Sequence, residues 1–136
     1  GTQYLKHFYK DEVLDYRQTR KLSSIRFSRN DTREIIAVCP WQIGKIDAKM
    51  DLFWNSASFQ EMTKEMVANY AKHIKRMLND KESRLCLCLY KGGDPERTLI
   101  PKDLLGIITN NASVVFEEIE PELEIDNSHY FVGNKK

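Results

Sequence analysis

A short apolar run that passes through small polar residues into a helix start is the feature that most constrains the fold of this sequence. Residues 52–54, Leu-Phe-Trp, are too few for a buried helix but suit a parallel strand covered on both faces. Ser58 and Glu61 then match an S-x-x-E capping box, in which each side chain bonds the backbone amide of the other residue. The run 51–62 therefore predicts a strand whose carboxyl end leads directly into a helix.

That helix is predicted to extend from residue 59 to about residue 79. Apolar side chains recur along it at intervals of three or four, at Phe59, Met62, Met66, Tyr70, Ile74 and Met77. A stripe with this spacing packs against a sheet. Methionines on such a stripe indicate core filling rather than a cofactor site.

Four further segments are predicted to contribute strands. The segment 34–39 ends at Pro40, because proline cannot donate to a strand ladder. The segment 85–90 is continuously apolar, and 114–119 and 123–132 alternate loosely, which predicts an antiparallel pair at a sheet edge. Val13 and Leu14 fit either the continuation of an N-terminal helix or a short strand. Strand, helix, strand and then a strand pair predict one α/β domain over residues 1–136.

The composition sets limits on partners and location. The net charge is +1, with +4 over residues 1–33 and −4 over residues 113–136, so the two ends could attract each other. The basic N-terminal part could instead touch phosphates, but the near-neutral total argues against nucleic acid as a partner. No apolar run approaches the roughly 20 residues that cross a bilayer, and no leader pattern opens the sequence. We therefore expect a cytoplasmic location and no membrane partner.

Cysteines and histidines predict neither a disulfide nor a metal site. Cys39, Cys86 and Cys88 all lie in apolar strand-like runs, where buried thiols are expected. Cys86 and Cys88 share one face of a strand, at a spacing near the limit for a disulfide. The three histidines, His7, His73 and His129, are far apart and lack the spacing of metal ligands.

The run D-L-F-W-N-S-A-S-F-Q-E-M, residues 51–62, resembles the middle of the sugar O-methyltransferase family, a branch of the S-adenosylmethionine-dependent methyltransferases. Val67, Asn69, Tyr70 and Ile74 on the following helix extend the likeness, which is specific over about residues 33–75. The resemblance implies a Rossmann-like seven-stranded sheet in the order three, two, one, four, five, seven, six. It places the run at strand four.

The same resemblance implies that the chain is the C-terminal portion of this fold, with strands one and two absent. No G-x-G occurs in the sequence, so the glycine-rich cofactor loop has no counterpart, and the acidic residue expected at the end of strand two has none either. S-adenosylmethionine is the implied cofactor, and the chain alone is expected to be inactive. The missing strands would separate segment 34–39 from segment 51–55. Unpaired edges left in this way would favour rearrangement of segment 34–39 or pairing with a second copy of the chain.

Ligands of open α/β sheets lie beyond the carboxyl ends of the strands, which singles out a few candidate residues. Asn55 and Ser56 at the end of the first strand are expected to bind the cofactor, and Asn55 could instead orient an acceptor hydroxyl. Tyr90 and Lys91 at the end of the next are expected to bind the acceptor, a sugar-containing small molecule or a glycan. Asn55 fits the role of a turn residue equally well.

Methyl transfer to a hydroxyl also needs a base for the proton. Glu61 and His129 are the candidates, His129 because the pKa of histidine lies near neutral pH. A helix cap explains Glu61 without catalysis, and an ordinary surface position explains His129. A non-enzymatic α/β binding or assembly module is the alternative function.

Overall fold

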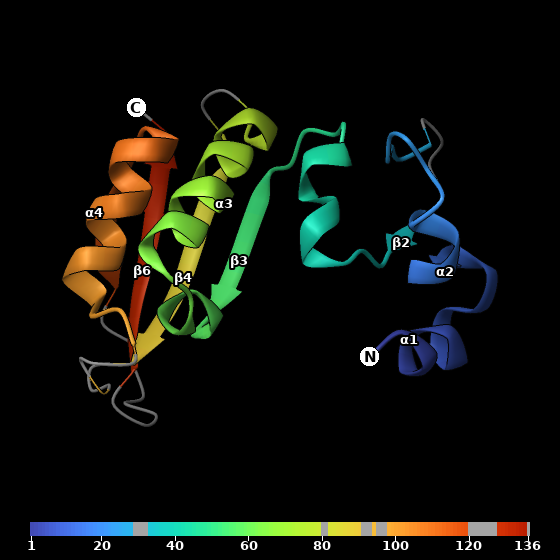
Figure 1. The fold of residues 1–136 in the computed structure, drawn as a ribbon, viewed down its shortest axis with the longest axis horizontal. Helices are drawn as coiled ribbons and strands as arrows, with labels where there is room; N and C mark the ends of the chain where they lie inside the picture. The colour runs from blue at the N-terminus through green and yellow to red at the C-terminus, as the bar shows by residue number, and fades with distance from the viewer. Residues whose placement is uncertain (29–32, 80–81, 91–93, 95–97, 120–127, 136) are drawn as a thin grey trace. The chain divides into compact units, whose positions relative to one another are not determined.

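The computed structural model describes residues 1–28, 33–79, 82–90, 94, 98–119 and 128–135 (Figure 1). Contacts divide the chain into two compact units, residues 1–48 and residues 49–136. The single domain expected over residues 1–136 stays a prediction.

Unit 1, residues 1–48, combines short helices with one pair of parallel strands. Its elements are α1 (Thr2–Tyr9), η1 (Lys10–Glu12), β1 (Val13–Leu14), α2 (Tyr16–Thr19), β2 (Ile35–Ile36) and η2 (Pro40–Lys45). β1 pairs in parallel with β2, so Val13 and Leu14 form a strand rather than the end of a helix.

The strand predicted over 34–39 is limited to Ile35 and Ile36. Its partner β1 is only two residues long, and the backbone amide of Ala37 makes one further bond to the carbonyl of Leu14. The strand therefore ends before Pro40, at which η2 begins, so the predicted stop at the proline is not where pairing ends. The strand is therefore shorter than its apolar composition predicts, because no longer neighbour pairs with it among the described residues.

Unit 2, residues 49–136, is a four-stranded sheet with two helices over one face (Figure 1). Its elements are β3 (Leu52–Ser56), η3 (Ser58–Glu61), α3 (Lys64–Met77), β4 (Arg84–Tyr90), α4 (Pro101–Ala112), β5 (Val114–Ile119) and β6 (Ser128–Lys135). The strand order is β3-β4-β6-β5, with β3 and β4 parallel and β6 antiparallel to both of its neighbours. This is the order four, five, seven, six that the resemblance implies.

The core of unit 2 lies between one face of this sheet and α3 and α4. Leu85, Leu87 and Leu89 on β4 pack with Ile74 of α3 and Leu104 of α4, all buried. The other face is less covered, because Leu52 and Trp54 of β3 are 56% and 57% exposed. The prediction that this strand is covered on both faces is therefore wrong for the described residues.

The helix after β3 begins later than predicted. Residues 58–61 form the 3-10 helix η3, and α3 starts at Lys64 with Thr63 as its N-cap, whose side chain accepts the Met66 amide. The capping box between Ser58 and Glu61 does not form, because the hydroxyl of Ser58 accepts from the Asn55 side chain instead. The later start also rotates the buried face of α3.

The buried residues of α3 are Val67, Ala71, Ile74 and Met77. Met66, which was predicted to lie on the buried stripe, is 49% exposed. Ile74 and Met77 are confirmed. The helical period was therefore correct and its phase partly wrong, because a new cap moved the start of the helix.

Candidate functional site

The carboxyl ends of the parallel strands β3 and β4 are the structural centre of the candidate site. β3 ends at Ser56, and Ala57 then adopts a left-handed backbone with φ 60°. The Ala57 amide donates to the Cys88 carbonyl at 2.8 Å. This main-chain bond extends the β3–β4 ladder by one residue beyond β3. The chain turns sharply at this point into η3.

Asn55 holds this turn together. Its side chain is 9% exposed, and its Nδ2 donates to the hydroxyl of Ser58 at 2.7 Å. Its Oδ1 accepts the amide of Phe59 at 3.3 Å. The side chain of Asn55 thus acts within the turn, which is the structural role that the sequence also left open to it.

Gln60, a residue that sequence reasoning did not select, joins the ends of three segments. Its Oε1 accepts the Tyr90 amide at 2.8 Å, and its Nε2 donates to the carbonyls of Tyr90 and Leu99, each at 3.3 Å. Its backbone carbonyl accepts the Leu99 amide at 2.7 Å. The sequence around Gln60, S-F-Q-E, does not indicate this role, because its hydrogen-bond partners Tyr90 and Leu99 are distant in sequence.

The candidate residues that the structure describes lie at one end of the sheet but on its two faces. β6 starts where β4 ends, since Ser128 pairs with Tyr90, so His129 lies at the same end as Ser56. Asn55 and His129 pair with Leu87 and Leu89, on the face that α3 and α4 cover.

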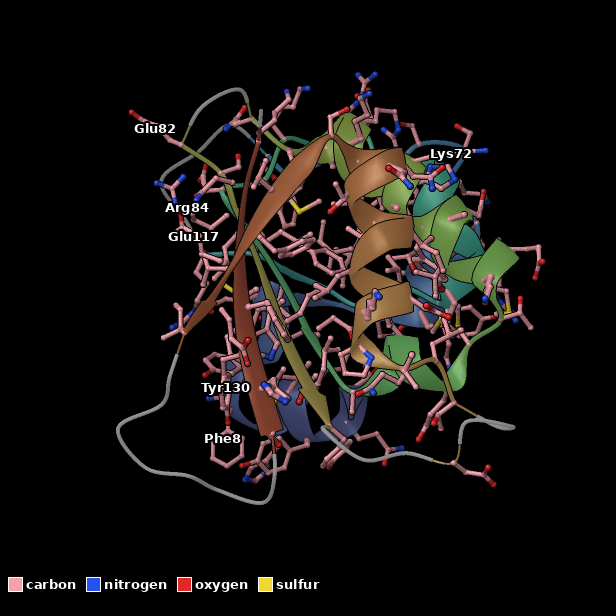
Figure 2. The ribbon with its side chains drawn as sticks, turned by 90° about the vertical axis from the view of Figure 1, so that its left-hand side faces the viewer. Phe8, Lys72, Glu82, Arg84, Glu117 and Tyr130 are labelled. Atoms are coloured by element: carbon pink, nitrogen blue, oxygen red, sulfur yellow. The ribbon has the colours of Figure 1, made fainter. Side chains whose placement is uncertain are left out.

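Ser56 and Tyr130 both pair with Cys88, on the opposite face of the sheet. Tyr90 lies two residues after Cys88 on β4 and therefore on the same face as Cys88. We call this less covered side, which includes Trp54 and Tyr90, the open face. Figure 2 shows Arg84, Glu117 and Tyr130 on the side of the sheet away from α4. The sheet therefore separates the two sets of candidates.

Glu61 and Lys91 complete the predicted set. Glu61 is exposed and ends η3, close in sequence to Gln60. Lys91 lies outside the described residues. The structure thus leaves the role of each as a prediction.

His129 has a carboxylate partner. Its Nδ1 contacts an oxygen of Glu118 on the neighbouring strand β5, and its ring stacks on Phe131 with centroids 5.9 Å apart. A carboxylate at Nδ1 orients the imidazole and leaves Nε2 as the nitrogen that can exchange a proton. These contacts with Glu118 and Phe131 therefore hold the His129 ring in one orientation, on the helix-covered face.

Two titratable groups of β4 and β6 stay neutral at neutral pH. A hydrogen bond with the Cys88 thiol raises the pKa of Tyr130. Burial raises the pKa of Cys86. Neither group is a base under ordinary conditions, and the three cysteines form no disulfide within the described part of the chain.

Asp15 in unit 1 is the second residue that sequence reasoning missed. It directly follows β1, and it borders a hollow of about 370 Å³ with Lys6 and Arg17. Its carboxylate accepts from Lys6 at 2.6 Å and from the Arg17 amide at 2.8 Å, so it caps α2. The two-residue length of β1 hid this position from the sequence pattern.

The described ranges contain neither a metal-binding cluster nor a helix that could cross a membrane. No cluster of three or more histidine, cysteine, aspartate or glutamate side chains suited to a metal occurs there. None of the helices in these ranges has both the length and the apolar character that crossing a bilayer requires.

Comparison with solved structures places this arrangement among known folds. An O-methyltransferase family protein from Burkholderia thailandensis superposes with a TM-score of 0.57 at 8% identity, over 76% of this chain and 36% of its own. Magnesium protoporphyrin IX methyltransferase from Synechocystis PCC 6803, with bound SAM, gives 0.53 at 11% identity over 76% and 47%. Human N-acetylserotonin methyltransferase, in complex with SAM, gives 0.54 at 9% identity over 80% and 35%.

The chain has a methyltransferase-like fold. It spans about a third to a half of the length of these three structures. Neither a protein-family model nor a curated protein matches the sequence. The methyltransferase-like fold thus rests on the three-dimensional arrangement, and identities this low carry no further property across.

Proposed function

We propose that this chain is part of an S-adenosylmethionine-dependent O-methyltransferase and forms the acceptor side of its site. The observation that carries the proposal is the sheet order β3-β4-β6-β5 within a methyltransferase-like fold, with candidate polar residues at the carboxyl ends of β3 and β4. Ligands of open α/β sheets bind at such ends. The acceptor is a sugar hydroxyl, as the motif at residues 51–62 implies.

The described residues do not form a complete cofactor site. Both polar groups of Asn55 are bonded within its own turn, and the Asp15 carboxylate is bonded to Lys6 and to backbone amides. The sequence has no G-x-G. We propose that this chain binds the cofactor only with a further segment that supplies such a loop, while Asn55 shapes the turn and Ser56 faces the cofactor.

Glu61 and His129 are the proposed bases for the acceptor proton. Glu61 is exposed at the carboxyl end of β3, and His129 is oriented by Glu118. In the protein extended at its N terminus, substituting the true base, as Glu61→Gln or His129→Gln, should lower turnover by about 100-fold with little change in acceptor KM. If both variants keep full turnover, neither residue is the base. Tyr90 and Lys91 are the proposed acceptor contacts.

Calorimetric titration of S-adenosylhomocysteine tests the function. It is carried out on this chain and, in parallel, on the product of the reading frame extended at its N terminus. Binding by the longer protein alone supports the proposal. Binding by neither protein favours a non-enzymatic binding or assembly module. The titration does not test the cytoplasmic location, which stays a prediction.

A second copy of the chain is the proposed protein partner. β3 and β5 are the two edges of the four-stranded sheet, and exposed strand edges favour pairing with another chain. Size-exclusion chromatography with light scattering should give a dimer mass. A monomer at all concentrations would contradict pairing through these edges.

A further inference from the structure

The side chain of Gln60 lies where the backbone of β3 would continue. Parallel pairing of β3 with β4 ends at Ser56 and Cys88, and the Ala57 amide adds one bond to the Cys88 carbonyl. The chain then leaves the sheet as η3, although β4 continues to Tyr90. Without another group, the last residue of β4 would lack a partner on this side.

Gln60 supplies that partner with a group of the same chemistry as a peptide bond. Its Oε1 accepts the Tyr90 amide at 2.8 Å and its Nε2 donates to the Tyr90 carbonyl at 3.3 Å. A side-chain amide has one acceptor and two donors, and the second donor bonds the Leu99 carbonyl at 3.3 Å. The side chain therefore continues the ladder by one residue and joins it to a segment near α4.

Leu99 is bonded by Gln60 a second time, through the backbone. Its amide donates to the Gln60 carbonyl at 2.7 Å, and α4 begins two residues later at Pro101. Gln60 is 4% exposed, so these four bonds are largely shielded from water and costly to lose. Gln60, which follows β3 in the chain, thus sets the distance between the end of β4 and the segment that leads into α4.

We propose that Gln60 is a positioning residue, which fixes Tyr90 and Leu99 at the strand ends where the acceptor binds. The binding of an acceptor at these strand ends rests on the proposed function. The hydrogen bonds of Gln60 do not depend on it. The side chain of Tyr90 lies half-exposed on the open face. Gln60 bonds both the backbone amide and the backbone carbonyl of Tyr90. A change at Gln60 should therefore move the acceptor contacts rather than the cofactor contacts.

The wild-type chain provides the first test, by NMR hydrogen exchange. Both Nε2 protons of Gln60 should exchange at least roughly tenfold more slowly than those of the exposed Gln3, because they are bonded and buried. Equal exchange rates in the two glutamines would overturn the proposal without any variant.

The variant Gln60→Glu provides the second test through a pH profile. At about pH 7.5 the introduced carboxylate still accepts the Tyr90 amide but cannot donate to the Tyr90 and Leu99 carbonyls. The Leu99 segment should then loosen, so the protection of the Leu99 amide, which bonds the carbonyl of residue 60, should fall roughly tenfold. Burial raises the pKa of such a carboxyl, and below about pH 5 its proton can donate again and restore the protection. Gln3→Glu should change nothing, and the Leu85 and Leu87 amides should stay protected throughout.

A loss shared equally by Leu85 and Leu87, with no recovery on acidification, would show a general structural role and overturn the proposal. If Gln60→Glu does not fold, Gln60→Met replaces it. Methionine lacks both the amide acceptor and the donors, so protection of the Tyr90 amide should fall roughly tenfold with no pH recovery. Unchanged Tyr90 protection in that variant would also overturn the proposal.

The acceptor role has its own readout. Glucose, galactose, mannose and N-acetylglucosamine are titrated as probes, and their affinities are read from amide shifts at the strand ends. Weaker binding by roughly tenfold in Gln60→Met, with S-adenosylhomocysteine affinity unchanged in the extended protein, supports positioning. Equal sugar binding by wild type and variant overturns the positioning role.

Binding of neither S-adenosylhomocysteine nor any sugar by the wild-type proteins instead overturns the proposed function, while the exchange data still report on the hydrogen bonds of Gln60.

Discussion

The side-chain amide of Gln60 bonds both backbone polar groups of Tyr90, thirty residues further along the chain. This contact completes the sheet at the point where the chain of β3 has already turned away. It also places a glutamine, rather than a predicted ligand, at the centre of the candidate site.

Gln60→Leu should destabilise unit 2 by about 2 kcal/mol, because buried groups of Tyr90 and Leu99 lose their partner. Urea unfolding followed by fluorescence measures the change. Gln3→Leu, at an exposed position, is the control and should shift stability by less than about 0.5 kcal/mol. Equal midpoints for wild type and Gln60→Leu would contradict the bonding described.

Gly133→Ala should destabilise the antiparallel strands by about 1–3 kcal/mol through overpacking. A Cβ at Gly133 would lie 2.4 Å from Cγ1 of Val114 and 2.8 Å from Cε1 of Phe116, both on β5. Gly106→Ala is a matched control, since a Cβ there meets nothing within 4 Å and alanine favours a helix. Thermal unfolding should therefore show opposite shifts for the two variants.

Thr63→Ala should cost about 1 kcal/mol, because it removes the N-cap bond to the Met66 amide. Thr63→Ser keeps the hydroxyl and should stay close to wild type. The free energy of unfolding in urea distinguishes them. A similar loss in both variants would place the effect in packing rather than in the cap.

Acid should weaken the start of α2 through Asp15. The hydrogen bond from Lys6 lowers the pKa of Asp15 below its ordinary value of 3.8, with smaller contributions from the Gln18 and Arg17 amides. A lowered folded-state pKa means that the stabilisation is present above the unfolded-state pKa and is lost as the pH falls through the folded-state pKa. In wild type, protection of the Arg17 amide should therefore decline below about pH 4.

Asp15→Asn tests that expectation, because asparagine keeps the cap acceptor but cannot titrate. Its Arg17 amide should show a flat profile over the same range. A parallel decline in wild type and variant would assign the acid sensitivity to another group.

Local signals predicted much of the sheet in unit 2. The run at residues 52–54 and the apolar segment 85–90 became the parallel pair β3 and β4, and residues 114–119 became β5. These predictions held because strand formation there follows from apolar pattern and turn residues close in sequence. The resemblance added the order of the strands, which alternation alone does not specify.

The site was less predictable than the fold. Asn55 was selected for its place at a strand end, but its amide is used by Ser58 and Phe59. Ser58 looked like a helix cap, yet Thr63 caps α3, since either residue type satisfies a local capping pattern. Which of two capable side chains bonds an amide depends on the path of the turn, and the left-handed backbone at Ala57 sets that path.

The sequence by itself determined strands β3, β4 and β5, the period of α3 and the presence of a turn after β3, because these depend on residues within a few positions of one another. Only the tertiary structure decided that Gln60 bonds Tyr90 and Leu99, that Asp15 follows a strand, and that the sheet separates Ser56 from His129. Those relationships join segments that are distant in sequence or depend on strand register. Burial then makes each such hydrogen bond costly to lose, and no local pattern records which distant group will provide it.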